Sequence, residues 1–479
     1  MTIRMDEGAA ELLDTLHRAG YAAYVVGGCV RDSLLGLTPH DWDLCTSALP
    51  QQVMELFGAQ RCIPTGLQHG TVTVKQSGAL YEITTFRTEG TYTDGRHPDE
   101  VHFVPDVRED LARRDLTINA MAYNEKEGLV DPFGGQADLQ SGIVRAVGVP
   151  RQRFTEDALR ILRLYRFAAR FGFAIDPPTA QAAQELCAHL DCVSVERIEE
   201  ELAKLLAAPA PAAYLNEKIL GVVLPELSSE ALAAAKPVVD ACPAGEENLP
   251  VRLAALLGAL GEADTRRVLK RLRCSNACIE ETAVLVRETA GEGVCGSFLL
   301  GHEFELRHPA DASCLEQHSH PAGRCPNSNS LFPPQAAVVA VAGHSIARPI
   351  AFGNRVPPQR TVLRETTVTP DFTIYARRLL GKYNLCTVQR LAALGTALQP
   401  EHAADFAALS ELAEQLDADG VCCRVSQLAV NGRDLMAAGV PAGPGIRKVL
   451  EALLDSVIRE EYPNERQALL AAVQQLAAS

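Results

Sequence analysis

Two kinds of hydrophobic pattern follow one another along the chain. Short apolar runs at 22–26, 71–74 and 80–86, with glycine-containing turns beside them, predict strands in the first 145 residues or so. From about residue 147, apolar side chains recur at helical spacing, and this spacing predicts helices over 181–190, 195–206 and 249–260. The pattern therefore predicts a small head of strands and helices, followed by a long helical body.

Two stretches lack a regular pattern. Residues 88–107 are polar and contain both glycine and proline, so we expect a long loop there. Residues 292–370 hold nine of the 28 Pro and five of the 12 His, with few charges. We interpret 292–370 as an insertion and a candidate for disorder, because helical spacing resumes at 375–380.

The composition limits the class of protein. With 47% hydrophobic and 22% charged residues, the 479-residue chain is ordinary for a globular protein of about three domains. A net charge of −15 argues against a protein that coats nucleic acids, although residues 145–170 are locally basic. No apolar run approaches the ~20 residues that span a bilayer, no secretory signal is visible, and the 14 Cys lack regular spacing. We therefore expect a cytoplasmic protein with no membrane partner.

A phosphate-binding turn is predicted where the first strand ends. The run Val25-Val26-Gly27-Gly28-Cys29-Val30-Arg31-Asp32 leads from an apolar strand through two glycines into a helix expected near Val30. Glycine at position 28 lets the backbone approach a triphosphate closely, and Arg31 could add a bidentate phosphate contact. Taken alone, the same residues also fit an ordinary strand-to-helix turn with a surface arginine.

Acidic residues follow this turn. Asp41 and Asp43 are two positions apart, so on a strand both carboxylates would lie on one face. Such a pair repels unless a divalent cation lies between the carboxylates, and Mg²⁺ prefers one or two carboxylates plus phosphate oxygens. Glu82, on the predicted strand 80–86, could assist metal binding or activate a hydroxyl group, although an exposed strand position explains it equally well.

Two arginine-rich clusters lie further along the chain. In Arg113-Arg114-Asp115-Leu116-Thr117-Ile118-Asn119-Ala120 the arginines precede an expected helix and could bind phosphate, but a helix cap with an ion pair fits as well. The second cluster has charged residues three positions apart, at Asp157, Arg160, Arg163 and Arg166. On a helix these would share one face, where they could read a base edge and hold phosphate or form a solvated ladder of ion pairs.

These motifs, in this order, resemble the signature of one enzyme family. Gly-Gly-x-Val-Arg-Asp, Asp-x-Asp, Arg-Arg-Asp-x-Thr-x-Asn-Ala and Glu-Asp-x-x-Arg-x-x-Arg resemble the class II tRNA nucleotidyltransferases, which are the bacterial CCA-adding enzymes and their poly(A) polymerase relatives. The run Asp131-Pro132-Phe133-Gly134-Gly135 is similar to the family's hinge between head and neck, and 430–465 is similar to the tail of its Firmicutes-like branch. The resemblance covers roughly 1–290 and 371–479.

The resemblance implies an α+β fold in five parts. A small mixed-sheet nucleotidyltransferase head at 1–145 would precede an all-helical neck, body and tail. The neck at 146–206 would carry the nucleotide-selecting helix, and 207–291 would form the helical body. The insertion at 292–370 has no counterpart in the family, and 371–479 would form the tRNA-binding part of the body and tail.

The resemblance also implies a reaction. The enzyme would add C, C and A to the 3′ end of tRNA from CTP and ATP, with Mg²⁺ as cofactor and without a nucleic-acid template. The terminal hydroxyl would attack the α-phosphorus, and pyrophosphate would leave.

The family's functional positions can be assigned to residues of this chain. The metal ligands and catalytic acids would be Asp41 and Asp43, with Glu82 as a candidate third acid. The nucleotide-binding residues would be Gly28, Arg31, Arg114, Asp157, Arg160, Arg163 and Arg166. Asp157 and Arg160 would pair with the base and reject G and U, because a wrong base leaves buried donors or acceptors unpaired.

Other functions remain open from the sequence. A relative could add only A, or a poly(A) tail, whereas the loop at 94–98 disfavours a CC-only enzyme. The intact pair Asp41 and Asp43 disfavours a non-catalytic RNA-binding protein. A zinc knuckle in the insertion has suitable ligand types without a standard spacing, in Cys314, His318, His320 and Cys325. The oligomeric state is also open, with a homodimer as one alternative.

Overall fold

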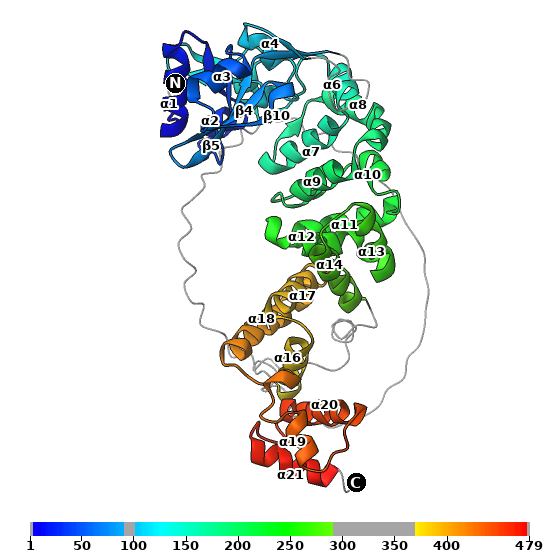
Figure 1. The fold of residues 1–479 in the computed structure, drawn as a ribbon. Helices are drawn as coiled ribbons and strands as arrows, with labels where there is room; N and C mark the ends of the chain where they lie inside the picture. Colours follow the sequence, from blue (N-terminus) through cyan, green and yellow to red (C-terminus); the bar gives the residue numbers. More distant parts are fainter. Residues whose placement is uncertain (1–2, 91–100, 291–368, 477–479) are drawn as a thin grey trace, which may run out of the picture. The chain divides into compact units, whose positions relative to one another are not determined.

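The computed structural model describes residues 3–90, 101–290 and 369–476 (Figure 1). The chain divides into two compact units, one formed by Met1–Glu303 with Ala376–Ser479 and the other by Phe304–Tyr375. The segment 94–98, most of the predicted insertion 292–370 and the four candidate zinc ligands lie outside the described residues.

A mixed sheet forms the centre of the N-terminal head. Its order is β3-β4-β5-β2-β1-β8-β9. In this described sheet β2 runs parallel to β5, with Leu44 opposite Ile83, and the other neighbouring strands run antiparallel. The strands are β1 (Ala23–Val26), β2 (Leu44–Thr46), β3 (Cys62–Gly66), β4 (Thr71–Gln76), β5 (Ala79–Thr85), β8 (Ala122–Asn124) and β9 (Gly128–Val130). The sheet confirms the α+β class and the three strands that the apolar runs predict.

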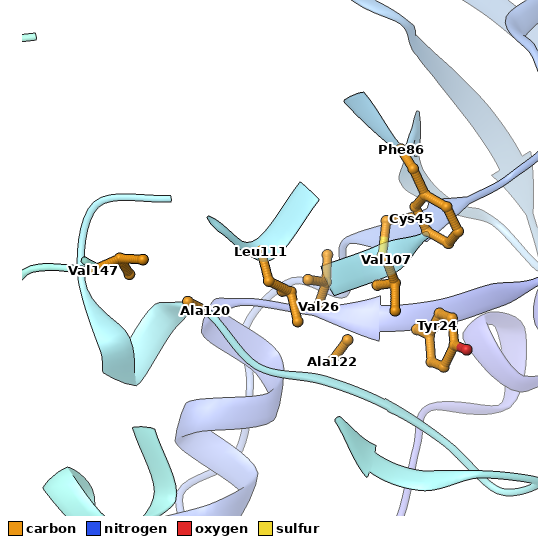
Figure 2. Close-up of a cluster of buried hydrophobic side chains, with 9 residues drawn as sticks. All are labelled: Tyr24, Val26, Cys45, Phe86, Val107, Leu111, Ala120, Ala122 and Val147. Atoms are coloured by element: carbon orange, nitrogen blue, oxygen red, sulfur yellow. The ribbon is translucent and has the colours of Figure 1, made fainter. Parts of the chain in front are cut away.

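Apolar strands and one helix bury the core of the head. All four residues of β1 are buried, as expected for a central strand with neighbours on both sides. The head helices are α1 (Glu7–Arg18), α2 (Gly28–Leu34), α3 (Pro50–Phe57), α4 (Val107–Ala112) and α5 (Gly135–Ser141). Figure 2 shows the buried cluster formed by Tyr24, Val26, Cys45, Phe86, Val107, Leu111, Ala120, Ala122 and Val147. The glycine-containing end of β1 is therefore built on a rigid, closely packed base.

Part of the predicted loop 88–107 forms strands. β6 (Arg87–Glu89) and β7 (Val101–Phe103) pair antiparallel, with Thr88 opposite His102. The prediction of a continuous loop over 88–107 is therefore wrong where β6 and β7 form. The pairing depends on a partner more than ten residues away, which a local hydrophobic pattern does not reveal.

Helices form the rest of the described chain, apart from a short parallel pair of β10 (Ile143–Val144) with β11 (Ala174–Ile175). After the head come α6 (Pro150–Glu156), α7 (Leu159–Phe171), α8 (Pro177–Glu185) and α9 (Val195–Leu206). The apolar spacing predicts α9 with the bounds observed, because Ile198, Leu202 and Leu205 fall on one buried face.

The body and tail continue as helices. Their bounds are α10 (Glu217–Val223), α11 (Ser229–Ala241), α12 (Leu249–Leu257), α13 (Gly261–Arg271), α14 (Asn276–Thr289), α16 (Pro370–Lys382), α17 (Leu385–Leu398), α18 (Ala403–Ala418), α19 (Gly432–Ala437), α20 (Pro444–Ile458) and α21 (Arg466–Leu476). The last three share a small core around Leu435, Leu453 and Leu469. Among the helices of the described ranges, none has the length and apolar character needed to cross a bilayer.

Candidate active site

A sharp turn at Gly27 joins β1 to α2. The φ angle of Gly27 is +81°, a region that residues with a Cβ rarely adopt, and its N–H donates to the carbonyl of Met121 at 3.0 Å. A Cβ on Gly27 would stand 3.0 Å from Nη1 of Arg114. The turn formed by Gly27 and Gly28, called the glycine turn below, therefore requires glycine and lies directly beside a guanidinium group.

Arg31 lies behind the glycine turn and is only 4% exposed. Its Nε donates to Oδ1 of Asp32 at 2.8 Å, and its Nη1 donates to Oδ1 of Asn119 at 2.5 Å. Its guanidinium carbon lies 5.0 Å from the ring centroid of Phe167 on α7. The remaining nitrogen, Nη2, is 3.6 Å from where a Cβ on Gly28 would stand. Arg31 therefore supports the turn and directs one nitrogen toward it, instead of standing on the surface.

The acidic pair precedes β2. Asp41 and Asp43 lie in an irregular segment and not on a strand, which corrects the expected strand geometry. The N–H of Val26 donates to the backbone carbonyl of Asp43 at 2.9 Å, so Asp43 lies beside the end of β1. In the parallel pair of β2 and β5, Leu44 is opposite Ile83, so Glu82 lies on the neighbouring strand at the level of Asp43.

The three acids influence one another electrostatically. Desolvation, together with the negative charges of Asp41 and Glu82, raises the pKa of Asp43 to about 6, while Arg114 opposes the rise. The surface of Asp43 nevertheless remains exposed, so a ligand can reach it. The described residues contain no group of three His, Cys, Asp or Glu side chains arranged to hold a metal. A cation here would therefore use the two aspartates and oxygens from substrate or water, a donor set that suits Mg²⁺.

Arg113 and Arg114 share one buried carboxylate. Asp110 accepts hydrogen bonds from Nε and Nη2 of Arg113 at 3.0 and 2.8 Å and from Nη2 of Arg114 at 3.4 Å. Burial opposes the charge on Asp110, but the two guanidinium groups outweigh it and hold the pKa of Asp110 below its ordinary value. Nε of Arg114 is buried and has no hydrogen-bond partner in the described part of the chain. A guanidinium group with an unpaired donor, whose Nη1 lies beside Gly27, suits an anionic ligand such as a phosphate.

Asp115 connects this segment to α7. It accepts from Nε of Arg163 at 2.7 Å and from Nδ2 of Asn119 at 3.2 Å. Burial opposes its charge, but Arg163 outweighs the burial and holds the pKa of Asp115 well below its usual range. Because Asn119 also accepts from Arg31, hydrogen bonds run continuously from the glycine turn to α7. The segment 117–119 is a 3₁₀ turn that leads into β8, which corrects the expectation of an apolar helix there.

The predicted helical stripe from Asp157 to Arg166 is interrupted. α6 ends at Glu156, Asp157 is extended with φ −145° and ψ 105°, and α7 begins at Leu159. Oδ1 of Asp157 accepts from the N–H of Leu159 at 3.0 Å, so Asp157 precedes α7 and binds its first turn. The helical prediction is wrong for Asp157, because short acidic side chains compete with the backbone in this way, and it holds for the three arginines on α7.

The three arginines of α7 are held in place by neighbouring segments. Nη2 of Arg160, a residue that is 8% exposed, donates to the carbonyl of Arg113 at 3.1 Å. Nε of Arg166 lies 2.6 Å from a carboxylate oxygen of Glu201, and Nη1 of Arg163 lies 3.6 Å from the other oxygen. Their orientation is therefore set before any ligand arrives.

An open pocket of about 260 Å³ unites these clusters. Its lining, called the arginine pocket below, consists of Arg113, Arg114, Asp115, Asp157, Leu159, Arg160, Arg163 and Arg197. The pocket thus brings together Arg114, Asp157, Arg160 and Arg163 of the predicted residues. The other predicted residues lie outside this lining: Gly28 and Arg31 on α2, Asp41 and Asp43 in the irregular segment before β2, Glu82 on β5 and Arg166 on α7. Several guanidinium donors next to carboxylate acceptors fit an anionic ligand that also presents a hydrogen-bonding base edge.

Sequence reasoning missed Arg197. This residue lies on α9, 40 positions after Asp157, and donates from Nη2 to Oδ2 of Asp157 at 2.7 Å and from Nη1 to Oδ1 at 3.3 Å. One signal was available in the sequence: Arg197 and Glu201 are one helical turn apart, next to the buried Ile198 and Leu202. Charged residues at the border of a buried helix face require partners.

Comparison with protein families gives three matches along the chain. Residues 23–145 match the family described as "Poly A polymerase head domain". Residues 172–230 match "Probable RNA and SrmB- binding site of polymerase A", and residues 366–473 match "tRNA nucleotidyltransferase domain 2 putative". The first match contains the glycine turn and the acids, and the second contains α9.

Individual proteins also resemble the chain, and a curated relative and a solved structure do so over nearly its whole length. It is 33% identical over 467 residues to the CCA-adding enzyme of Levilactobacillus brevis, which covers 98% of this chain and 97% of the relative. It is 41% identical over 288 residues to the CCA-adding enzyme of Lactiplantibacillus plantarum, over 59% of this chain and 70% of the relative. The solved structure of the Bacillus stearothermophilus CCA-adding enzyme in complex with CTP matches with a TM-score of 0.69 and 28% identity, over 99% and 98% of the two chains.

Proposed function

The chain belongs to the CCA-adding enzyme family of tRNA nucleotidyltransferases, and from this premise we propose that it adds C, C and A to the 3′ end of tRNA. The nucleotides come from CTP and ATP, no nucleic-acid template is used, and pyrophosphate is released. Relatives that carry this activity in their names match 98% of the chain, including its helical part. The function therefore concerns the whole chain and not the head alone.

The arginine pocket is the observation that carries this proposal. It places the acceptor Asp157 and the donor Arg160 in one lining of about 260 Å³. Cytosine and adenine each present an amino donor next to a ring-nitrogen acceptor, which complements a carboxylate beside a guanidinium group. Uracil and guanine reverse that pattern and would leave the pocket's polar groups unpaired. Protein side chains can thus replace a template strand.

The triphosphate is assigned to the neighbouring cations. Arg114 has a buried Nε without a partner in the described chain, and it lies next to Gly27. Arg31 directs Nη2 toward Gly28, and Arg163 faces the same pocket from α7. Glycine at the turn allows phosphate oxygens to approach the backbone, while the arginines balance their charge. Arg166 contributes to this site indirectly. It forms an ion pair with Glu201, and the same carboxylate also orients Arg163.

Asp41 and Asp43 would hold Mg²⁺. Burial, together with the negative charges of Asp41 and Glu82, raises the pKa of Asp43 to about 6, and a bound cation would offset those charges. Two carboxylates with substrate oxygens form a typical magnesium donor set. When bound, Mg²⁺ supplies Lewis-acid stabilisation of the charge that develops on the α-phosphate. Glu82 lies at the level of Asp43 on β5 and adds negative charge to this site.

The chemical step is a displacement at phosphorus. The 3′ hydroxyl oxygen of tRNA forms a bond to the α-phosphorus, and the bond to the pyrophosphate oxygen breaks. The protein holds the base in the arginine pocket and the triphosphate at the glycine turn. The α-phosphorus is therefore held in a fixed position for attack by the 3′ hydroxyl. The helices after the head would bind the tRNA. We propose that 1–145 is the catalytic head, that 146–206 is the neck with the nucleotide-selecting helix, that 207–291 is the helical body, and that 371–479 is the tRNA-binding part of the body and tail. Because its proposed substrates, tRNA, CTP and ATP, are present in the cytoplasm, we assign the enzyme to that compartment.

Incubation with three tRNAs tests the proposal. The substrates end before the first C, after the first C and after the second C, and each is offered CTP, ATP, UTP or GTP alone and CTP with ATP. We expect C on the first two substrates, A on the third, and a completed CCA end from CTP with ATP. Addition of A alone to the third substrate with no C addition would identify an A-adding enzyme. A run of A on any end would identify a poly(A) polymerase, and no product would support a non-catalytic RNA-binding protein.

A further inference from the structure

The carboxylate of Asp157 is already largely occupied by protein donors. Its Oδ1 accepts from the N–H of Leu159 at 3.0 Å and from Nη1 of Arg197 at 3.3 Å. Its Oδ2 accepts from Nη2 of Arg197 at 2.7 Å. A carboxylate offers about four lone-pair positions in all. With two used at Oδ1 and one at Oδ2, the remaining acceptor position lies on Oδ2.

The fork of Arg197 sets the direction of that remaining position. A guanidinium group bound to both oxygens of a carboxylate fixes the plane of the carboxylate as well as its place. The Leu159 N–H alone would leave the side chain free to rotate, because it binds one oxygen. The side chains of Asp157 and Arg197 are 13% and 23% exposed, so the pair is partly shielded from water.

The helix that carries Arg197 is itself anchored in the same site. Glu201, one turn further along α9, is 5% exposed and lies 2.6 Å from Nε of Arg166 and 3.6 Å from Nη1 of Arg163. Ile198, which lies between Arg197 and Glu201 in the sequence, is buried at 7% exposure. One face of α9 therefore orients the acceptor Asp157 through Arg197 and two arginines of α7 through Glu201.

We propose that Arg197 is a positioning residue for base selection: it fixes Asp157 so that Oδ2 accepts from the amino group of cytosine or adenine. This inference rests on the proposed function, in which Asp157 reads the base edge. Arg197 acts through Asp157 and is not assigned a contact with the base. Without the fork, the carboxylate of Asp157 can rotate, so its free acceptor position no longer faces only the place of the base amino group, and the carbonyl of uracil meets less repulsion there. Loss of Arg197 therefore lowers discrimination and not only affinity.

A double-mutant cycle tests this pairing. The variants are Arg197→Met, Asp157→Ala and the double variant, and Arg197→Lys keeps the charge but not the fork. Arg271→Met is a matched control, because Arg271 also binds both oxygens of a carboxylate, that of Glu226, away from the arginine pocket. For each full-length protein, kcat and KM are measured with CTP and with UTP on a tRNA that ends before the first C. Thermal unfolding by circular dichroism confirms that each variant is folded.

We expect Arg197→Met to lower the ratio of kcat/KM for CTP over that for UTP by about tenfold, the effect of one hydrogen bond to a charged group. Arg197→Lys restores part of the ratio, and Arg271→Met leaves it unchanged. In the Asp157→Ala background, Arg197→Met produces no further change. Should the two single effects multiply in the double variant, or should folded Arg197→Met and Arg197→Lys proteins keep the wild-type ratio, the inference is overturned. An unchanged ratio in Asp157→Ala would instead overturn the base-reading role in the proposed function, on which the inference rests.

Discussion

Nε of Arg163 donates to Oδ2 of Asp115 at 2.7 Å, although the two residues are 48 positions apart in the chain. This bond joins the segment that follows α4 to the helix α7. Asp115 also accepts from Asn119, which accepts from Arg31 behind the glycine turn. The phosphate-binding turn and the arginine pocket are therefore parts of one hydrogen-bonded structure, and a change in one alters the geometry of the other.

Removal of the charge on Asp115 should destabilise the protein in a pH-dependent way. The folded state lowers the pKa of Asp115, so its ionised form stabilises the fold above the unfolded pKa of about 3.9 and this contribution is lost as the pH falls. We expect Asp115→Asn to lower the free energy of unfolding by about 2 kcal/mol at pH 7, less than for a fully buried pair because Arg163 is partly exposed. Urea denaturation at pH 7, 5 and 3 measures this. The difference from wild type should be similar at pH 7 and 5 and smaller at pH 3, and a pH-independent difference would contradict the electrostatic explanation.

Either aspartate of the predicted metal pair should be essential for transfer. Asp41→Ala or Asp43→Ala should reduce Mg²⁺-dependent nucleotide incorporation by about a thousandfold or more, because several kcal/mol of transition-state stabilisation are lost. Circular dichroism should show an intact fold, since both carboxylates are exposed. Asp14→Ala is the control, because Asp14 is an exposed acid paired with Arg18 on α1. Near-normal incorporation by either variant would refute the metal assignment.

Metal-free protein should become more stable when Asp43 loses its charge. The folded state raises the pKa of Asp43 to about 6, so ionisation of Asp43 destabilises the fold as the pH rises from about 4 to 6. We expect Asp43→Asn to gain up to about 1 kcal/mol at pH 8 without metal, a modest amount because the residue is exposed. At pH 4.5 the gain should fall to about a third, because Asp43 is then mostly protonated in the folded state. Unfolding in EDTA at the two pH values measures it, and a loss of stability at pH 8 would contradict the repulsion inferred here.

Nucleotide addition should survive removal of residues 292–369. The helices on either side of this segment are already joined, because Nζ of Lys382 and the hydroxyl of Tyr383 donate to Glu288 at 2.9 and 2.8 Å. Every residue assigned to the reaction also lies outside the segment. A variant with a short Gly/Ser linker in its place should keep kcat/KM for CTP within about threefold of wild type, within the usual context dependence of such effects. Loss of activity in a folded deletion variant would show that the segment takes part in the reaction.

The sequence predicts the local elements well, because each depends on its own residues. The apolar run before Gly27 forms β1, and the spacing in Val195–Leu206 forms α9 with the bounds expected. Arg114, Asp157, Arg160 and Arg163, which the sequence assigns to one nucleotide site, line one pocket, and their binding roles stay predictions. In these cases a periodic pattern, or a set of family motifs, contained the necessary information.

Long-range and side-chain effects explain the remaining differences. Asp157 leaves the helix because its own carboxylate binds the N–H of Leu159, which helical spacing does not reveal. Arg197 reaches Asp157 across 40 residues, and Arg31 is buried by contacts with Asn119 and Phe167 that come from distant segments. Such contacts depend on how the helices pack, and local patterns in the sequence do not reveal that packing.

Base selection by Asp157 and Arg160 is the central claim, and the ratio of kcat/KM for CTP over UTP on a tRNA lacking its CCA end tests it most directly. Asp157 supplies acceptors and Arg160 supplies donors, so the loss of either removes the penalty for a uracil or guanine edge. We predict that Asp157→Ala and Arg160→Ala each lower the ratio by about tenfold or more, in addition to slowing C addition. If both folded variants keep the wild-type ratio, Asp157 serves only as the ion-pair partner of Arg197 and Arg160 only as that of Glu156, and the base is selected elsewhere.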